Sequence, residues 1–127
     1  MAKILVVDDE QDIVRVVVKL MTSRGHEVTT AADGLEALEQ VAADRPDLII
    51  LDLNLPNMDG FEVCRRLKSD DATRSIPIVM MTAAYVSMEH ARQGEATGAD
   101  EYVVKPFLRE VLIHNVERLL RSADASS

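Results

Sequence analysis

The chain has 127 residues, enough for one domain with one hydrophobic core and too few for a second. Its 14 Lys and Arg against 22 Asp and Glu give a net charge of −8, which repels nucleic acid phosphates and anionic lipid and argues against direct binding to either. Hydrophobic residues make up 47% of the chain and charged residues 28%, which excludes a disordered chain and predicts a packed domain.

The cellular compartment is indicated by the cysteine content and by the N-terminus. The single cysteine, Cys64, excludes a disulfide within the chain, and its apolar neighbours favour a reduced core residue. The apolar run at the N-terminus is too short, and too soon followed by acids, for a secretory signal or a membrane span. We therefore expect a cytoplasmic protein without a membrane segment.

Short apolar runs alternate with segments of helical period along the chain. The strands are predicted, in order, over residues 4–7, 28–31, 48–51, 76–81 and 102–104. The helical spacing is clearest after the first strand, where the apolar stripe consists of Ile13, Val16, Val17, Leu20 and Met21. Gly25 is expected to close this helix and Pro46 follows the end of the second. Asp33-Gly34 and Asp59-Gly60 predict turns before the second and third helices.

The last two predicted helices differ in their apolar stripes. Ser87 is a suitable N-cap for a fourth helix that runs to about Gly94, but the sparse stripe of this helix predicts the weakest packing of the five. The fifth helix carries apolar residues regularly from Leu108 to Leu120. Residues 122–127 are polar and small, and we predict a domain over residues 1–121 followed by a tail or the start of a linker.

The predicted fold class is α/β. Strands that are continuously apolar and separated by single helices are typical of a parallel sheet that is buried on both faces. We therefore predict a single doubly wound five-stranded parallel sheet with five helices. In such a sheet, ligands bind outside the carboxyl ends of the strands, at the point where the strand order reverses.

Polar residues follow four of the five predicted strands: Asp8, Asp9 and Glu10 after the first, Asp52 after the third, Thr82 after the fourth and Lys105 after the fifth. If the strand order is 2-1-3-4-5, the first and third strands are neighbours about 4.8 Å apart, and Asp8 and Asp9 lie beside Asp52. Carboxylates so close together either bind a divalent cation or hold a proton. Oxygen ligands without a nearby His or Cys favour Mg²⁺ or Mn²⁺ over zinc.

The same arrangement suits the transfer of a phosphoryl group to Asp52. A carboxylate is a weak nucleophile, so the reaction depends on positioning and on neutralising the phosphoryl oxygens. A metal ion, the Lys105 ammonium and the Thr82 hydroxyl would bind these oxygens. The expected product is an acyl phosphate on Asp52.

Four motifs in order resemble the receiver domain of two-component response regulators and are chemotaxis-regulator-like. They are Val7-Asp8-Asp9-Glu10, the ten residues from Leu51 to Gly60, Met81-Thr82-Ala83 and the six residues from Tyr102 to Phe107. Each motif alone is weak, but four in order with matching spacing, over residues 3 to about 121, are specific. The resemblance implies a flavodoxin-like sheet of order 2-1-3-4-5.

The resemblance also implies the metal ligands and the phosphoacceptor. Asp52 would accept the phosphoryl group, and Asp9 would bind Mg²⁺ directly. Asp8 would bind the ion largely through water, and the backbone carbonyl of Asn54 would complete the protein ligands. Mn²⁺ could replace Mg²⁺.

The remaining site residues would bind the phosphoryl group and transmit its presence. By resemblance, Thr82, Ala83 and Lys105 would contact phosphate, and the bond from Lys105 to Pro106 would be cis. Thr82 and Tyr102 would be the switch pair, which reshapes the face formed by the fourth helix, the fifth strand and the fifth helix.

The function implied by the resemblance is a phosphorylation-activated signalling switch and not an enzyme. The phosphodonor would be a sensor histidine kinase or a histidine phosphotransfer protein, and a phosphorylation-dependent homodimer fits the family. The output partner is not predicted. Two alternatives stay open: a receiver fragment of a larger transcription regulator or hybrid sensor kinase, and a pseudo-receiver that binds partners without phosphorylation.

Two unrelated function classes fit the residues poorly. An aspartyl-phosphate hydrolase of the haloacid-dehalogenase type has a second acid two residues after its nucleophile, where this chain has Asn54. A flavodoxin-like electron carrier needs a phosphate-binding loop after the first strand, where Asp8, Asp9 and Glu10 would repel the phosphate.

Overall fold

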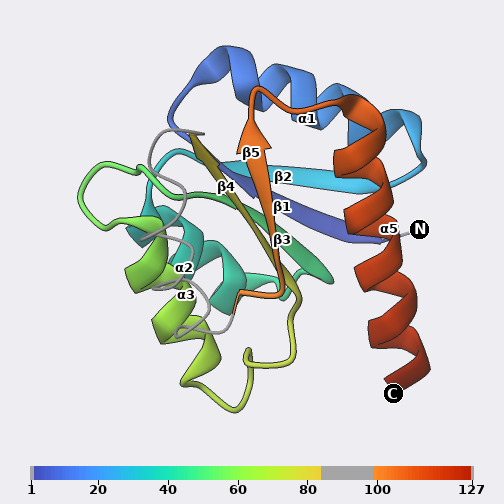
Figure 1. Ribbon diagram of the computed structural model, residues 1–127. Coiled ribbons are helices and arrows are strands. Elements are labelled where there is room, and N and C mark those ends of the chain that lie inside the picture. The colour runs from blue at the N-terminus through green and yellow to red at the C-terminus, as the bar shows by residue number, and fades with distance from the viewer. Residues whose placement is uncertain (1, 84–98, 127) are drawn as a thin grey trace.

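The computed structural model describes residues 2–83 and 99–126, and within them it contains one five-stranded parallel sheet covered by helices on both faces (Figure 1). The strand order is β2-β1-β3-β4-β5. The elements are β1 (Lys3–Val7), α1 (Gln11–Ser23), β2 (Glu27–Ala31), α2 (Gly34–Ala43), β3 (Leu48–Asp52), α3 (Gly60–Lys68), β4 (Ile78–Ala83), β5 (Glu101–Lys105) and α5 (Arg109–Ser126). The predicted α/β class and the implied flavodoxin-like order are confirmed. The predicted fourth helix, at residues 87–94, lies outside the described residues.

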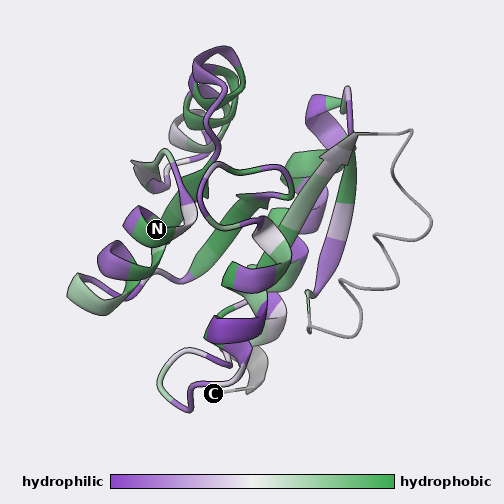
Figure 2. Ribbon diagram, turned by 90° about the vertical axis from the view of Figure 1, so that its left-hand side faces the viewer, coloured by the Kyte–Doolittle hydropathy of each residue, from purple (hydrophilic) through white to green (hydrophobic). Residues whose placement is uncertain are grey.

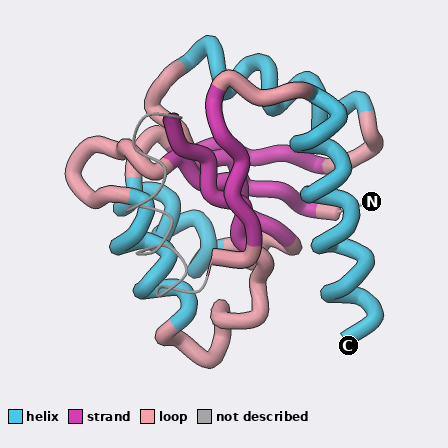
Figure 3. Tube along the Cα trace, viewed as in Figure 1, coloured by secondary structure: helices cyan, strands magenta, loops and turns pink. Residues whose placement is uncertain are grey.

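The sheet separates two hydrophobic clusters. Helices α1 and α5 cover one face, and α2 and α3 cover the other (Figures 1 and 3). Successive side chains of a strand point to opposite faces. Leu5 accordingly packs in the α2–α3 cluster, whereas Val6 packs in the α1–α5 cluster. This two-sided burial explains why the central strands β1, β3 and β4 are largely apolar, and Figure 2 shows most of the sheet as hydrophobic. The edge strands β2 and β5 are more exposed.

The strand boundaries lie within two residues of those predicted, and the largest shift is in β4. This strand begins at Ile78 and ends at Ala83, two residues later at each end than predicted. Pro77 has no N–H to give to the ladder, and the Ile76 N–H is donated to the Thr73 carbonyl at 3.0 Å. The shift places Thr82 inside β4. Asp52 and Lys105, expected just after their strands, are the last residues of β3 and β5.

The turn residues end and begin helices as predicted. Gly25 follows α1 with φ +87°, and its N–H donates to the Thr22 carbonyl at 3.0 Å. Glycine adopts this left-handed conformation without steric cost. Asp33 and Asp59 are the N-caps of α2 and α3, and each carboxylate accepts a hydrogen bond from a backbone amide three residues later.

Helix α5 extends beyond the predicted end of the domain. It runs to Ser126, so residues 122–126 continue the helix. The boundary between a domain ending at residue 121 and a following linker stays a prediction. Among the helices in the described part of the chain, none combines the length and the apolar character that a membrane crossing requires.

Candidate functional site

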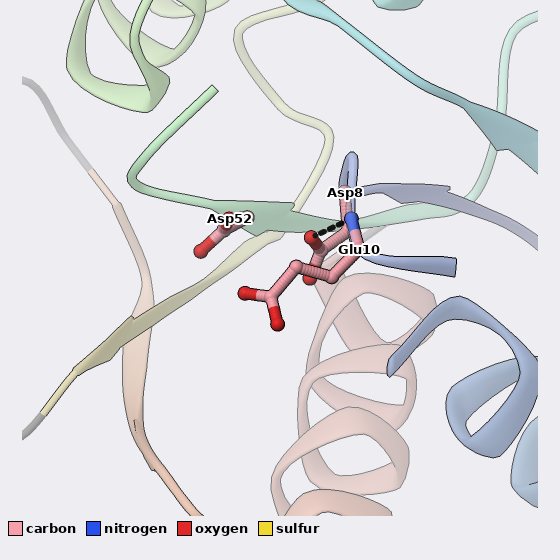
Figure 4. A group of neighbouring side chains, drawn as sticks. All are labelled: Asp8, Glu10 and Asp52. Carbon is pink, nitrogen blue, oxygen red and sulfur yellow. Dashed lines mark hydrogen bonds between the residues drawn. The ribbon is translucent and has the colours of Figure 1, made fainter. Parts of the chain in front are cut away.

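The carboxyl edge of the sheet brings together polar residues that are distant in the sequence. Asp52 ends β3, Lys105 ends β5, and Asp8 directly follows β1. Because β1 and β3 are neighbours, paired through Val7 and Leu51, Asp8 and Asp52 lie next to each other. Figure 4 shows the carboxylates of Asp8, Glu10 and Asp52 gathered at this edge. The predicted convergence of Asp8, Asp52 and Lys105 therefore occurs in the structure.

The Lys105 ammonium group is shared among three carboxylates. Its Nζ lies 3.1 Å from Asp8 Oδ2, 3.2 Å from Asp52 Oδ1 and 3.5 Å from Glu10 Oε1. The side chains of Asp8 and Asp52 are 0% and 4% exposed, whereas that of Glu10 is 62% exposed. One ammonium group cannot neutralise three ionised carboxylates, so the site keeps an excess of negative charge.

This excess charge changes the ionisation of the site. Burial raises the pKa of Asp52 to about 6, and the charge of Asp8 adds to the effect. Lys105 and the Asn54 backbone amide oppose this rise without cancelling it. Burial by itself would lower the pKa of Lys105, but the charges of Asp52 and Asp8 outweigh it and raise that pKa. The site therefore holds a charged lysine and a carboxyl group that is easily protonated.

The raised Asp52 pKa predicts a pH-dependent gain in stability for Asp52→Asn. The ordinary Asp pKa is 3.8, whereas that of Asp52 in the folded protein is about 6. Because the folded protein favours the protonated carboxyl group, the contribution of Asp52 to the free energy of unfolding is fully present below pH 3.8 and is lost as the pH rises through 6. An asparagine does not ionise. Without divalent cations, we expect Asp52→Asn to raise the free energy of unfolding by about 3 kcal/mol at pH 8 and by little at pH 4. Urea unfolding at both pH values measures this, and equal gains would contradict the raised pKa.

The donor set fits a hard divalent cation. Among the described residues, Asp8, Glu10 and Asp52 each offer one carboxylate oxygen, and these three oxygens lie within 4.8 Å of one another. Oxygen donors and excess negative charge suit Mg²⁺ or Mn²⁺ better than zinc. Asp9 is exposed and is not part of this group. Its predicted role as a direct ligand stays a prediction.

Glu10 is the member of the group that sequence reasoning missed. The sequence places it among the acids after the first strand but indicates no role for it. The available signal was its position next to Asp8 and Asp9. This signal was ambiguous, because acids are also favoured at the start of a helix for purely electrostatic reasons.

Thr82 and Tyr102, the predicted switch pair, are neighbours in the sheet. Thr82 is buried, and Tyr102 is partly buried and packs against the α2–α3 cluster. The register pairs Met80 with Tyr102 and Thr82 with Val104. Thr82 and Tyr102 therefore lie diagonally across from each other on one face of the sheet. Their contribution to switching stays a prediction.

The remaining predicted residues lie around Asp52 and Lys105. Ala83 ends β4 and pairs in register with Lys105. Asn54 is an exposed residue of the loop after β3, and its backbone amide hydrogen-bonds to the Asp52 carboxylate. The peptide bond between Lys105 and Pro106 is cis, as the resemblance implied.

Comparison with known proteins identifies the family. The family model described as the response regulator receiver domain matches residues 4–117. This chain belongs to that family. Receiver domains are signalling domains of two-component systems, and the acidic group of Asp8, Glu10 and Asp52 lies in the receiver domain described above.

Curated relatives of this receiver domain are longer proteins. The response regulator PleD of Caulobacter vibrioides is 44% identical over 120 residues, which cover 94% of this chain and 26% of PleD. RpaA of Synechocystis, a DNA-binding dual master transcriptional regulator, is 40% identical over 124 residues, which cover 98% of this chain and 51% of RpaA. The chain thus spans about a quarter of one relative and about half of the other.

Solved structures of receiver domains have the same fold. The chemotaxis response regulator CheY4 of Vibrio cholerae has a TM-score of 0.87 and 40% identity, and the alignment covers 94% of this chain and 98% of CheY4. A putative response regulator from Chloroflexus aurantiacus has a TM-score of 0.91 and 33% identity, with 94% and 98% of the two chains covered. CheY4 is similar to this domain over nearly the full length of both chains.

Proposed function

We propose that this receiver domain is a phosphorylation-activated switch that accepts a phosphoryl group on Asp52 in an Mg²⁺-dependent reaction. The observation that carries the proposal is the Lys105 ammonium group held between buried Asp8 and Asp52 at the carboxyl edge of the sheet. This arrangement supplies a nucleophile, a cation for phosphoryl oxygens and carboxylates for a metal ion. The family match supports the same reaction.

Asp52 would act as the nucleophile. One of its carboxylate oxygens would form a bond to phosphorus while the phosphorus–nitrogen bond of a phosphohistidine breaks. The electron pair of the broken bond stays on the imidazole nitrogen, which is then protonated. Lys105, already 3.2 Å from Asp52, would bind an oxygen of the transferred group. The Thr82 hydroxyl and the end of β4 at Ala83 would bind another.

The proposed ligands of the metal ion are Asp8, Asp9, Asp52 and the backbone carbonyl of Asn54. When bound, Mg²⁺ or Mn²⁺ would neutralise charge on the phosphoryl oxygens beside Asp52. The buried pair of Asp8 and Asp52 supports this assignment, because one ammonium group leaves the pair with excess negative charge.

The proposed phosphodonor is a phosphohistidine of a sensor histidine kinase or a histidine phosphotransfer protein. Phosphorylation would act through Thr82 and Tyr102 on the surface that includes β5 and α5, where it could promote a homodimer or the binding of an output partner. We propose a cytoplasmic location and no direct nucleic acid binding by this acidic domain. An output in another domain of a longer protein is the alternative, since PleD and RpaA extend well beyond the matched region.

The proposal predicts phosphorylation without a protein partner. We expect the chain to gain one phosphoryl group when it is incubated with a small-molecule phosphodonor and Mg²⁺, and none when a chelator removes the ion. Intact mass spectrometry measures the gain, and added Mn²⁺ should restore it after chelation. No gain in Mg²⁺, with binding of the ion confirmed by calorimetry, would contradict the proposal.

A further inference from the structure

The side chain of Glu10 does not cap the helix at whose start it lies. It is the N-cap residue of α1, and short polar side chains at this position accept hydrogen bonds from the first amides of a helix. Asp33 and Asp59 do so at the starts of α2 and α3. The Glu10 side chain makes no capping hydrogen bond. No capping hydrogen bond to α1 therefore fixes the Glu10 side chain.

The Glu10 carboxylate lies at the carboxyl edge of the sheet instead (Figure 4). Its Oε1 is 3.5 Å from Lys105 Nζ, and the carboxylate is grouped with those of Asp8 and Asp52. The Glu10 backbone N–H donates to Asp8 Oδ1 at 2.9 Å. Glu10 thus orients Asp8 with its backbone and contacts Lys105 with its side chain.

A divalent cation and the Lys105 ammonium group compete for the same buried oxygens. Lys105 contacts both Asp8 and Asp52, so a cation that binds these carboxylates must weaken or displace the lysine contacts. Glu10 is a third carboxylate within reach of the ammonium group and lies on its solvent side, being 62% exposed. It can keep Lys105 paired when the buried carboxylates bind another cation.

We infer that Glu10 is a positioning residue that draws Lys105 away from Asp8 and Asp52 and so raises the affinity of this pair for a divalent cation. The inference rests on the proposed function, because it concerns the same cation-dependent site. Without Glu10, the Lys105 ammonium group has Asp8 and Asp52 as its remaining partners among the described contacts and competes more strongly with the metal ion.

The test is a double-mutant cycle on Mg²⁺ affinity, measured by isothermal titration calorimetry with the full chain. We expect Glu10→Gln to weaken Mg²⁺ binding about fivefold. One cause is the loss of a negative charge near the ion, and the other is that Lys105, without Glu10 as a partner, competes more strongly for Asp8 and Asp52. Lys105→Met should strengthen binding, because the competing ammonium group is gone. In the Lys105→Met background, Glu10→Gln should weaken binding by about twofold or less, since only the charge effect is left.

Asp12→Asn is the matched control. Asp12 lies in the first turn of the same helix, is 95% exposed and pairs with Arg15 at 3.4 Å. Its substitution removes one negative charge near the site without a contact to Lys105, and we expect Mg²⁺ affinity to change less than about twofold. Glu10→Asp, which keeps the charge but is one methylene shorter, should lose part of the affinity. Lys105→Gln replaces Lys105→Met if the latter does not fold.

The outcomes separate the inference from the proposed function. The positioning role alone would be overturned by any of three results for Glu10→Gln. These are no change in Mg²⁺ affinity, a change equal to that of Asp12→Asn, or the same change with Lys105 present and with Lys105→Met. A wild-type chain that binds no Mg²⁺ would overturn the proposed function together with the inference. A fivefold loss that shrinks in the Lys105→Met background would support both.

Discussion

We expect the Asp52→Asn protein to take up no phosphoryl group under conditions that label the wild type. The amide replaces the only atoms of this side chain that act as a nucleophile, and its similar shape preserves the fold. Asp52 is buried at the end of β3, where an uncharged side chain is at least as well tolerated as a carboxylate with a pKa of about 6. Intact mass spectrometry after incubation with a small-molecule phosphodonor and Mg²⁺ gives the result, with urea unfolding as a check of folding.

Asp71→Asn is the control for this experiment. Asp71 is 88% exposed and pairs with Arg74 at 3.1 Å, away from the carboxyl edge of the sheet. Its variant should be labelled as completely as the wild type. If labelling persisted in Asp52→Asn, peptide mapping would have to identify another acceptor. Asp8 would be tested first, because it is the other buried carboxylate among the described residues.

The second large effect, on stability, is expected from replacing Gly60, the first residue of α3, with alanine. A Cβ atom at this position would lie 2.5 Å from the backbone oxygen of Asp52 and 2.9 Å from the Cα atom of Leu53. The Gly60 N–H donates to the Leu53 carbonyl at 2.9 Å, which ties the start of α3 to the end of β3. An added methyl group must therefore push two backbone segments apart beside Asp52.

For Gly60→Ala we expect a loss of about 3 kcal/mol in the free energy of unfolding, typical of a severe steric clash in a packed interior. At this chain length, the corresponding drop in the melting temperature is about 10 °C. Phosphorylation of Asp52 should also slow, because the clash displaces the backbone that carries the nucleophile. Thermal and urea unfolding measure the first effect, and the rate of mass gain measures the second.

Gly25→Ala separates the clash from the conformational cost of replacing a glycine. Gly25 has φ +87°, but a Cβ atom there would meet nothing within 4 Å. We expect this variant to lose about 1 kcal/mol, the cost of a left-handed conformation for alanine, and to be phosphorylated normally. If Gly60→Ala were no less stable than Gly25→Ala, the result would contradict the close contact between Gly60 and the backbone at the end of β3.

Much of the fold is predictable because local sequence patterns reflect burial. The apolar runs at β1, β3 and β4 correspond to the three central strands, which are buried on both faces, whereas the weaker runs at β2 and β5 correspond to the more exposed edge strands. Asp33 and Asp59 mark the starts of α2 and α3, because a capping carboxylate binds amides only a few residues away. The strand order had no such local signal, and its prediction depended on the resemblance to receiver domains.

By itself, the sequence determined which residues would stand at the carboxyl ends of the strands, including Asp8, Asp52 and Lys105. Only the tertiary structure decided that the Lys105 ammonium group is shared among Asp8, Asp52 and Glu10. It also decided that Asp9 is exposed outside this group and that the pKa of Asp52 is raised. Ion pairing and ionisation depend on distances and burial across the sheet. Lys105 and Asp8 are 97 positions apart in the chain, so their contact is set by strand order and register and not by any pattern of neighbouring residues.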